Sequence, residues 1–342
     1  MHQMVCPCQE KMKGWIMMKI EQEGRTVFPV IVSNSSSLKS VNFYLLKERE
    51  TLYLIDAGMN DEACWNVLLH TLEVNDLSLS DLTGIILTHH HIDHVGLVDR
   101  IVLHNQIPVF VHEEAVLRLK RDSVFLEKRA DFFEKLYKEM GCGEAGEKQA
   151  RFVREAIEKN KDNALKTCLT PIEEGFLTSL SLRIIKMPGH APDQIALYDE
   201  KRGWLFGGDL LIGHISSNAI VEPDSSGNRI MTLVQHRESL EKCLKFNMNI
   251  VFPGHGMLIE NGKSLIQNRL RRIDKKAEKF VSAIGKGFAT AAEIAESYYK
   301  NVYYDHFSLV MSEVIGHLDY LENQGRVSKT KVEGVWQYTI QL

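Results

Sequence analysis

The sequence predicts an α/β fold with a helical insertion and a small winged-helix-like C-terminal domain. Short apolar runs recur through residues 20–262 and end at glycine turns, as the strands of a layered α/β domain do. Residues 113–176 interrupt these runs with a helical pattern, and residues 263–342 predict helices followed by two short strands. Residues 1–19 show neither pattern and are expected to be a loose N-terminal segment.

The composition is that of an ordinary soluble globular protein. Of 342 residues, 44% are hydrophobic and 25% are charged, which suits one large domain with a small appendage. The net charge of −4 argues against a general affinity for polyanions. Because the apolar runs are only strand-sized and the N-terminal segment lacks a signal-peptide core, we expect no membrane span and a cytoplasmic location. Six irregularly spaced cysteines fit the same reducing compartment.

The first part of the chain predicts strands and one amphipathic helix. Residues 27–32 form an apolar run, and residues 41–46 and 51–55 flank a charged turn, which is a β-hairpin signature. The hairpin ends at Asp56, which is expected either to cap a helix or to support a functional loop. Apolar residues at helical spacing then predict a helix over residues 62–72.

A histidine-rich segment follows the next predicted strand, residues 85–87. Within it, His89, His91, Asp93 and His94 form the pattern His-x-His-x-Asp-His. Imidazole and carboxylate groups this dense at the end of a strand suit a borderline metal such as zinc. A polyhistidine tag is the alternative, but a tag lies at a terminus and has no strand leading into it.

A helical block separates the two halves of the strand pattern. Residues 97–105 are predicted as a helix and residues 108–111 as a strand. The strand ends at His112, which has no ligand pattern nearby and is expected to be structural. Residues 113–163 then carry apolar residues at helical spacing, with a break at residues 141–146. An insertion of this length between strands often forms a lid or a substrate wall.

Three further predicted strands each end at a potential metal ligand. Residues 181–186 lead to His190, a hairpin of residues 195–198 and 204–206 leads to Asp209, and residues 250–252, after a helix over 231–245, lead to His255. Glycine accompanies each of the three ligands, and glycine lets the backbone turn sharply and approach an ion closely.

The candidate ligands together suit two metal ions. They are His89, His91, Asp93, His94, His190, Asp209 and His255. Two ions would need about this set if an aspartate and a water bridge them. A metal pair lowers the pKa of bound water from about 15.7 to about 7, which is worth on the order of 12 kcal/mol. A bridging hydroxide would then need no serine or cysteine nucleophile.

From about residue 27 to 259 the chain resembles the metallo-β-lactamase fold superfamily, specifically its glyoxalase II-like hydrolases. The resemblance implies an αββα sandwich. It also implies that His89, His91 and His190 hold one metal, that Asp93, His94 and His255 hold the second, and that Asp209 bridges them. Asp93 would also orient the bridging hydroxide, and Asp56 would support the ligand loop. The implied cofactor is two Zn²⁺ per chain, although the same ligands accept Mn²⁺ or iron.

Departures from related families narrow the activity. Zinc β-lactamases have a cysteine in place of Asp209, and flavodiiron proteins have a glutamate in place of His91. The segment after Asp209 lacks the glutathione-binding motif of glyoxalase II, and Ile212 stands where the best-known lactonases have a tyrosine. Only 45 residues separate Asp209 from His255, too few for the inserted domain of β-CASP nucleases.

Other polar residues have weaker patterns. His214 and Asn218 follow Asp209 and are candidates for substrate binding, with ordinary loop residues as the alternative. His90 is expected to be a non-ligand, because it would face away from its neighbours if the strand continued. His70, His104 and His236 lie in helical patterns and are expected at the surface.

The C-terminal region predicts three helices, over residues 264–283, 290–300 and 308–323, and a ribbon near its end. Thr290 and Glu293 fit a capping box at the start of the second helix. This order resembles the winged-helix-like tail of β-lactamase-like endoribonucleases. However, the third helix has no Lys or Arg, whereas a helix that enters a nucleic-acid groove should be basic. A packing or homodimerisation role is therefore favoured over nucleic-acid binding.

The sequence thus predicts a binuclear metal-dependent hydrolase of a small acyl compound, namely a thioester, an ester or a lactone. Three alternatives remain open: an RNA endonuclease of the β-lactamase-like type, a mononuclear iron persulfide dioxygenase, and a non-catalytic winged-helix module. The substrate cannot be named from the sequence, because the residues that would choose it lie in the insertion and the tail.

Overall fold

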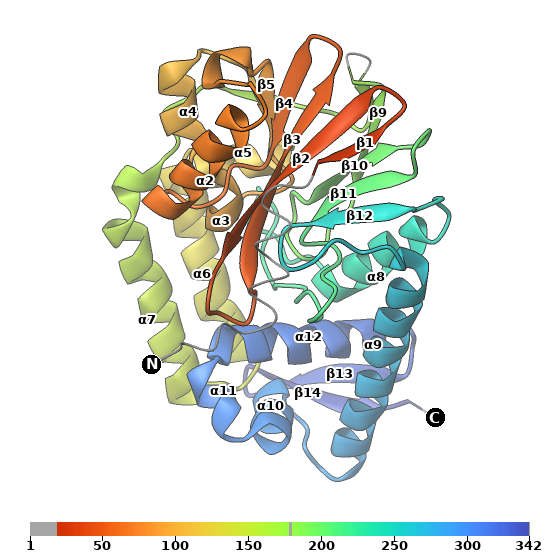
Figure 1. The fold of residues 1–342 in the computed structure, drawn as a ribbon. Coiled ribbons are helices and arrows are strands. Elements are labelled where there is room, and N and C mark those ends of the chain that lie inside the picture. Colours follow the sequence, from red (N-terminus) through yellow and green to blue (C-terminus); the bar gives the residue numbers. More distant parts are fainter. Residues whose placement is uncertain (1–18, 178–179, 342) are drawn as a thin grey trace, which may run out of the picture.

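The computed structural model describes residues 19–177 and 180–341 and contains two facing sheets and a separate ribbon (Figure 1). The first sheet has the strand order β1-β2-β3-β4-β5-β6-β7, and the second has the order β12-β11-β10-β9-β8. The predicted loose segment, apart from Lys19, lies outside the described residues. The strands are β1 (Ile20–Gln22), β2 (Arg25–Ser33), β3 (Ser40–Glu48), β4 (Thr51–Ile55), β5 (Gly84–Ile86), β6 (Val109–Val111), β7 (Leu169–Pro171), β8 (Gly175–Leu177), β9 (Leu182–Lys186), β10 (Ile195–Asp199), β11 (Trp204–Gly208), β12 (Ile250–Pro253), β13 (Val327–Val332) and β14 (Val335–Ile340).

Helices cover the outer faces of both sheets and build the C-terminal region. They are α2 (Glu62–Glu73), α3 (Ile92–Val95), α4 (Val98–His104), α5 (Glu113–Leu119), α6 (Ser123–Glu139), α7 (Gly143–Lys159), α8 (Thr232–Cys243), α9 (Gly262–Gly285), α10 (Ala291–Tyr299), α11 (Asn301–Asp305) and α12 (Phe307–Asn323), with short 3₁₀ turns at Leu79–Asp81 and Lys161–Asn163. In the part of the chain that the structure describes, no helix is long and apolar enough to cross a membrane.

Three buried clusters define four layers. One lies between the sheets and joins Leu46 of β3 to Phe206 of β11. A second joins the outer face of the first sheet, including Leu45, to α2, α4 and α5. A third joins the outer face of the second sheet to Leu240 of α8 and Ile266 of α9. Successive residues of a strand face opposite sides, so Leu45 and Leu46 contribute to different layers. The αββα sandwich is confirmed.

The strand pairings explain where the loops meet. Strands β2, β3 and β4 form an antiparallel meander, and β4, β5, β6 and β7 run parallel. In the second sheet β10 pairs antiparallel with β11, and β11 pairs parallel with β12. Both predicted hairpins are confirmed. Because parallel strands end at the same edge, the loops after β4 and β5 lie side by side, and the Asp56 N–H donates to the Ile86 carbonyl at 2.9 Å.

The helical insertion contains three helices, α5, α6 and α7, in line with its helical spacing. Its predicted extent to residue 176 is wrong, because β7 and the start of β8 lie inside that range and β7 pairs with β6 in the first sheet. The predicted break at residues 141–146 is too long, because α7 already begins at Gly143. Gly146 is buried inside this helix, where a Cβ would come within 2.8 Å of the Tyr137 Cβ. The glycines therefore permit close packing of α7 on α6 as well as the turn itself.

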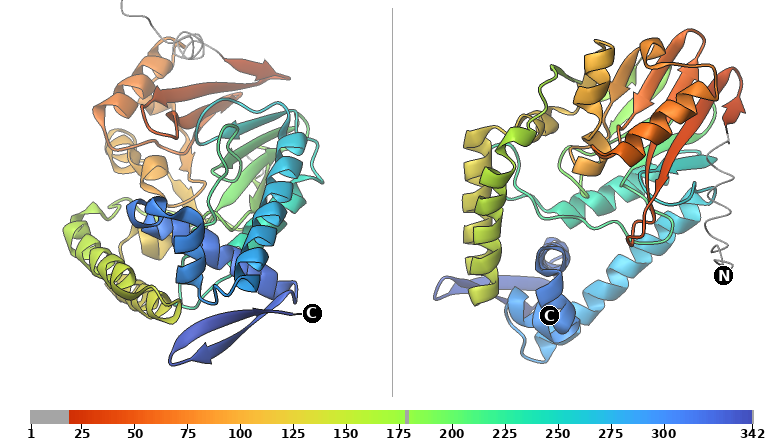
Figure 2. Two further views of the ribbon diagram at one scale, coloured as in Figure 1. Left: turned by 90° about the horizontal axis from the view of Figure 1, so that it is seen from below. Right: turned by 60° about the vertical axis from the view of Figure 1, so that its left-hand side comes forward.

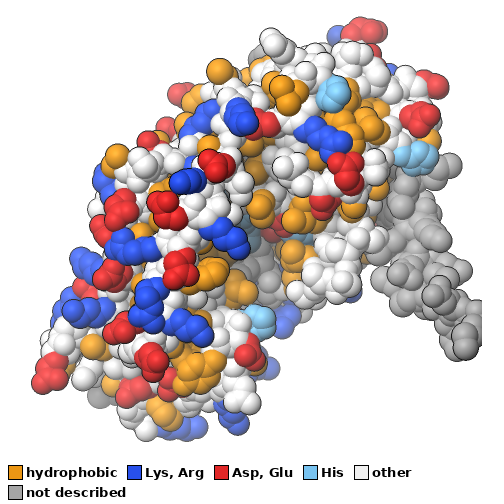
Figure 3. Space-filling model, turned by 90° about the vertical axis from the view of Figure 1, so that its left-hand side faces the viewer, with side chains coloured by type: hydrophobic (Ala, Val, Ile, Leu, Met, Phe, Trp, Pro, Cys, Tyr) orange, Lys and Arg blue, Asp and Glu red, His pale blue; other side chains and the backbone are white. Residues whose placement is uncertain are grey.

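The insertion and the C-terminal region share one hydrophobic core, as the adjacent position of their helices in Figure 2 suggests. Phe133 and Tyr137 of α6 belong to the same buried cluster as Phe280 of α9 and Val314 of α12. The exposed faces of α6 and α7 carry alternating acidic and basic side chains (Figure 3), among them Arg154, which contacts three carboxylates. The predicted boundary at residues 262 and 263 coincides with the start of α9, a continuous helix that runs from the second sheet into the tail.

The tail has the predicted elements. The capping box of α10 is present, with the Glu293 N–H donating to Thr290 Oγ1 at 3.2 Å, and β13 pairs antiparallel with β14. Twelve of the 17 residues of α12 are buried, so this helix is the centre of the tail. It has little surface to offer a nucleic-acid groove. The assignment to the winged-helix class stays a prediction.

A buried ion pair links the insertion to the loop after Asp209. Arg129 Nε donates to Glu222 Oε2 at 2.7 Å, and Arg129 Nη2 contacts the second oxygen. Burial opposes ionisation of Glu222, but the charge and hydrogen bonds of Arg129 outweigh it and lower the pKa of this carboxyl. A carboxyl whose folded pKa is depressed stabilises the fold above its unfolded pKa, and this contribution is lost as pH falls through the folded value.

We therefore expect Glu222→Gln to reduce the free energy of unfolding by about 2 kcal/mol at pH 7. The difference from the unmodified protein should shrink below about pH 4.3, the unfolded pKa of glutamate. Urea denaturation of both proteins across this range measures it. Exposed Glu155→Gln on α7 is the control and should change stability little. A difference that stays constant down to about pH 3 would contradict the prediction.

Candidate metal centre

All seven predicted ligands lie at one edge of the sandwich. His89 and His91 precede α3, and Asp93 and His94 lie within it. The other three follow strands of the second sheet: His190 comes after β9, Asp209 directly after β11, and His255 after β12. Among the residues that the structure describes, three groups of side chains could each hold an ion, and together they contain only these seven residues: His89, His91 and His190; His89, His94 and Asp209; and Asp93, His94 and His255.

In the first group, three ring nitrogens converge. His91 Nδ1 lies 3.0 Å from His89 Nε2 and 3.0 Å from His190 Nε2. His190 uses its Nδ1 to donate to the Asn218 carbonyl at 2.8 Å, and His89 Nδ1 lies 3.1 Å from Thr88 Oγ1. A neutral imidazole has only one N–H. The Nε2 atoms of His190 and His89 therefore carry lone pairs, and both atoms face His91 Nδ1. Converging lone pairs of this kind suit a cation.

The second group lies beside the first, and Asp209 spans both. Nε2 of His255 is 3.4 Å from Asp93 Oδ2 and 3.1 Å from Asp209 Oδ2. Asp209 Oδ2 is also 3.6 Å from His190 Nε2 in the first group, while its Oδ1 lies 3.5 Å from His94 Nε2. The carboxylate of Asp209 therefore faces both sets of ligands.

Buried polar atoms without partners test whether these residues fit metal ions. Among the described residues, His94 Nε2, His255 Nε2 and Asp209 Oδ1 are buried and have no hydrogen-bond partner. Leaving such atoms unsatisfied costs about 1–3 kcal/mol each. The three atoms come from α3 and from the segments after β11 and β12, and nitrogen and carboxylate oxygen are ordinary zinc ligands. The donor set fits divalent metal ions.

A second set of contacts orients the ligand side chains. Asp56 accepts from the Thr88 N–H at 2.7 Å, from Thr88 Oγ1 at 2.8 Å and from His94 Nδ1 at 2.8 Å. His255 Nδ1 donates to the Ser40 carbonyl at 2.7 Å. Such contacts fix the tautomer so that Nε2 faces the metal. Asp56 has a φ of +61°, in the left-handed region, and its carboxylate contacts the segment that carries the ligands.

Burial and mutual proximity set the protonation of the ligands. Burial, followed by neighbouring ring charges, lowers the pKa of His89 and of His91 well below the usual value, and burial also lowers the pKa of His190. Burial opposes the charge on His94, but Asp56 and Asp209 outweigh it and raise the pKa of His94 well above its usual range. Burial likewise opposes ionisation of Asp209, yet its histidine neighbours keep its pKa very low. Neutral imidazoles beside an ionised carboxylate are the forms that bind metals, so His89, His91 and His190 have the required form, whereas His94 must lose its proton when a metal binds.

Four of the histidines outside the three groups bear on the predictions from the sequence. The β5 strand ends at Ile86, so strand alternation does not explain the position of His90; instead, its Nδ1 lies 2.6 Å from the Asp193 carboxylate. His112 accepts from the Glu114 N–H and caps α5, in line with a structural role. His104 is exposed, whereas His236 is buried, so the expectation that it lies at the surface was wrong. The backbone of His236 packs against Gly189, where an added Cβ would come within 2.3 Å of the His236 Cα.

The two candidate substrate residues lie in the loop after Asp209. His214 Nε2 is 2.9 Å from the Ser37 carbonyl, and Asn218 Nδ2 donates to the Leu309 carbonyl at 3.3 Å. Sequence reasoning missed Ser217, whose Oγ lies 3.2 Å from His190 Nδ1 and donates to the Asp209 carbonyl. It also missed Ser40. A single serine in a loop leaves no pattern in a sequence, because its role depends on which distant strand end it meets.

Comparisons with known proteins agree with this geometry. Residues 37–255, more than half of the chain, match the family model of the metallo-beta-lactamase superfamily. A relative from Bacillus subtilis named probable metallo-hydrolase YqjP is 32% identical over 88% of this chain and 94% of its own length. A more distant relative from Aspergillus fumigatus, named atrochrysone carboxyl ACP thioesterase, is 21% identical over 76% of this chain and 68% of its own length.

A solved structure covers the tail and the insertion as well. The metallo-beta-lactamase family protein TTHA1429 from Thermus thermophilus has a TM-score of 0.74 and 24% identity, over 92% of this chain and 98% of that one. The whole arrangement, and not the sandwich alone, therefore recurs in that fold. The chain belongs to the metallo-β-lactamase superfamily and is a metal-dependent hydrolase.

Proposed function

We propose that this chain is a binuclear metal hydrolase of small acyl compounds, namely thioesters, esters or lactones. The observation that carries the proposal is the position of Asp209, whose two oxygens face both ligand sets at 3.1–3.6 Å. When bound, two divalent ions would supply an acidified water for attack and positive charge for the carbonyl oxygen of the substrate. Zn²⁺ is the expected metal, with Mn²⁺ or iron as alternatives for the same ligands.

The roles of the chain's own residues follow from their contacts. His89, His91 and His190 would hold the first ion, Asp93, His94 and His255 the second, and Asp209 both; these are the seven ligands of the three groups. Asp93 is the most exposed carboxylate of the set, with a side chain that is 19% exposed. It is therefore the acid that can reach a substrate, orient the attacking water and pass a proton towards the leaving group. Asp56 keeps His94 in place.

The preference for acyl compounds has two supports. The three ligand groups consist of histidines and carboxylates, which would hold metal ions that activate a water for direct attack on a carbonyl carbon. The name of the Aspergillus fumigatus relative includes a thioesterase activity. The RNA endonuclease hypothesis has less support, because the helix that would meet a groove, α12, is mostly buried. A mononuclear iron enzyme would not need Asp93 and His255 together.

Variants of the second ligand set test the proposal. We expect Asp93→Ala and His255→Ala each to lower kcat for a thioester or lactone by about 10²–10³-fold, the size of effect seen when one preorganised group at a reacting centre is removed. Bound metal should fall towards one ion per chain, because only the second set is damaged. Metal analysis and kinetics with thioester, lactone, phosphodiester and RNA substrates measure both effects.

Two results would count against the proposal. Hydrolysis that survives both substitutions would sink the binuclear mechanism. Cleavage of RNA with steep salt dependence, and none of neutral esters, would favour the endonuclease hypothesis instead. Exposed His70→Ala on α2 serves as the control, because it removes an imidazole far from the ligand loops.

A further inference from the structure

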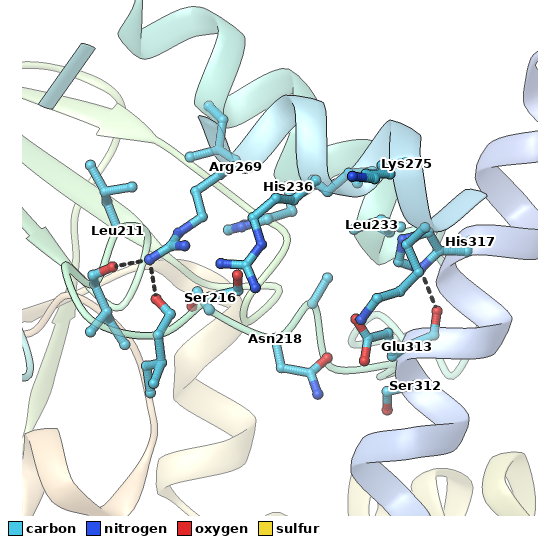
Figure 4. A pocket seen from close by; sticks show the side chains of 18 of the residues that line it. Leu211, Ser216, Asn218, Leu233, His236, Arg269, Lys275, Ser312, Glu313 and His317 are labelled. Atoms are coloured by element: carbon cyan, nitrogen blue, oxygen red, sulfur yellow. Dashed lines mark hydrogen bonds and ion pairs between the residues drawn. The ribbon is translucent and has the colours of Figure 1, made fainter. Parts of the chain in front are cut away.

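A cavity of about 550 Å³ adjoins the loop that follows Asp209. Its walls come from residues 210–219 on one side and from α8, α9, α10 and α12 on the other (Figure 4). This volume is within the range of about 300–1,000 Å³ that is usual for small-molecule sites. The walls combine apolar side chains with a group of basic ones, so an occupant would be both apolar and charged.

The basic side chains lie on one face of α9. Arg272, Lys275, Lys276 and Lys279 all line the cavity, and their spacing of three, four and seven residues places them along one stripe of a helix. The same helix also carries the acidic residues Asp274 and Glu278, but both pair with side chains of other segments. Asp274 contacts Arg237 and Tyr320, and Glu278 contacts Arg326.

Part of this charge is not neutralised. Lys276 pairs with Glu313, and Lys279 Nζ reaches only the Tyr298 hydroxyl, at 3.1 Å. Within the described part of the chain, Arg272 and Lys275 are exposed and have no acidic partner. Burial and the charge of Arg272 both lower the pKa of the neighbouring Arg269. Like charges gathered at the mouth of a cavity favour an anion there.

Two buried histidines add polar groups to the same cavity. His236 and His317 are 4% and 2% exposed and both line it. The Nδ1 atom of His236 and the Nε2 atom of His317 have no hydrogen-bond partner among the described residues. His317 Nδ1 donates to the Glu313 carbonyl, so its Nε2 can accept a hydrogen bond from a ligand. An occupant with hydroxyl or amide groups would satisfy these nitrogens.

The cavity is joined to the metal centre through the loop. Ser217 and Asn218 line the cavity and also contact His190. Arg269 donates to the carbonyls of Ile212, Gly213 and Ile215 at 2.7–3.1 Å, which ties α9 to the loop just after Asp209. The cavity and the metal centre therefore share the loop of residues 210–219, although none of the seven ligands lines the cavity itself, so a bound molecule would have to extend past this loop to reach them.

We propose that this cavity binds an organic phosphate, and that this phosphate belongs to the carrier thiol of an acyl thioester substrate. The inference rests on the proposed hydrolase function and names its substrate class. From Arg272 to Lys279 the basic stripe extends about 10 Å, which is long enough for one or two phosphate groups. The thioester carbonyl would point to the metal centre, and hydrolysis would release the carboxylic acid and the phosphorylated thiol.

Binding of coenzyme A, a thiol with phosphate, hydroxyl and amide groups, tests the site directly. In calorimetric titrations of the full chain, Arg272→Gln combined with Lys275→Gln should raise the Kd at least tenfold. The matched control combines Lys263→Gln with Arg271→Gln, which removes the same charge from exposed positions of α9 that do not line the cavity. Its Kd should stay within twofold. No binding to the unmodified protein at millimolar coenzyme A, or equal losses in both variants, would overturn the proposal.

Kinetics test whether the bound phosphate belongs to the substrate or to a separate ligand. They also test the proposed hydrolase function independently of binding. Arg272→Gln combined with Lys275→Gln should raise KM for a coenzyme A thioester at least tenfold. The same variant should leave KM for the phosphate-free pantetheine thioester unchanged. If KM for the coenzyme A thioester stays unchanged while ADP alters the hydrolysis rate, the phosphate comes from a separate molecule and the substrate assignment is overturned. If the chain binds coenzyme A but hydrolyses neither thioester, the proposed function is rejected and the binding site is kept. RNA that displaces coenzyme A and binds more tightly would reject the site itself.

Discussion

Asp209→Asn is expected to reduce bound metal from two ions per chain to one or fewer, and hydrolysis by about 10³-fold. The carboxylate of Asp209 faces His94, His190 and His255 within 3.6 Å, so it is the one anion shared by both ligand sets. An amide keeps the shape but loses the charge, and its NH₂ group cannot accept. Two dications would then repel each other without a shared anion, and the barrier would rise by about 4 kcal/mol. Metal analysis and thioester kinetics measure both changes.

A matched control separates loss of metal from loss of fold. Asp76→Asn changes the same chemical group at an exposed position after α2, where φ is +53° and asparagine is well tolerated. It should keep both ions and the full rate. Circular dichroism should be the same for both variants. An Asp209→Asn protein that holds two ions and hydrolyses at the original rate would rule out the shared-ligand role.

Gly254→Ala is expected to lower activity by about 10²-fold although it adds a single methyl group. A Cβ at this position would lie 2.3 Å from Asp209 Oδ1 and 2.5 Å from His94 Cε1. Both side chains are buried, and His94 is fixed by Asp56, so they must move by roughly 1 Å. A displacement of that size at a reacting centre costs about 10²-fold. The φ angle of Gly254 is not positive, so backbone strain adds nothing to this effect.

Gly207→Ala is the matched control for this prediction. Gly207 is a buried glycine in β11, and its φ angle is likewise not positive. A Cβ there would meet only Val251 Cγ1, at 3.6 Å, which is an ordinary contact. We expect full activity and metal content for this variant, measured with the same thioester and by metal analysis. Equal losses in Gly207→Ala and Gly254→Ala would mean that the strands, and not the ligands, were disturbed.

Local patterns in the chain were sufficient for most of the fold. Alternation and helical spacing located both hairpins, the helices of the insertion and the capping box of α10, because these signals depend on neighbours a few residues apart. The same holds for the candidate ligands, since each follows a strand at a tight turn. Contacts between distant segments escaped this reasoning. Ser217 and Ser40 anchor His190 and His255, and neither lies in a recognisable pattern.

The tail shows most clearly what a sequence count misses. By composition, the acidic residues Asp274 and Glu278 dilute the positive charge of α9. In the structure they pair with Arg237 and Arg326, which leaves Arg272 and Lys275 facing a cavity. Net charge sums all charged residues of a segment, whereas the potential at a binding site depends on which of those side chains face it.

The sequence by itself predicted the candidate metal ligands, because histidines and aspartates at strand ends form a pattern that can be read from neighbouring residues. The tertiary structure alone decided what lies around these ligands. It joined the insertion to the tail in one core, buried α12 and His236, and placed the basic face of α9 against the loop after Asp209. These features depend on packing between segments far apart in the chain. Burial at those contacts decides which charged groups and ring nitrogens remain available to a substrate.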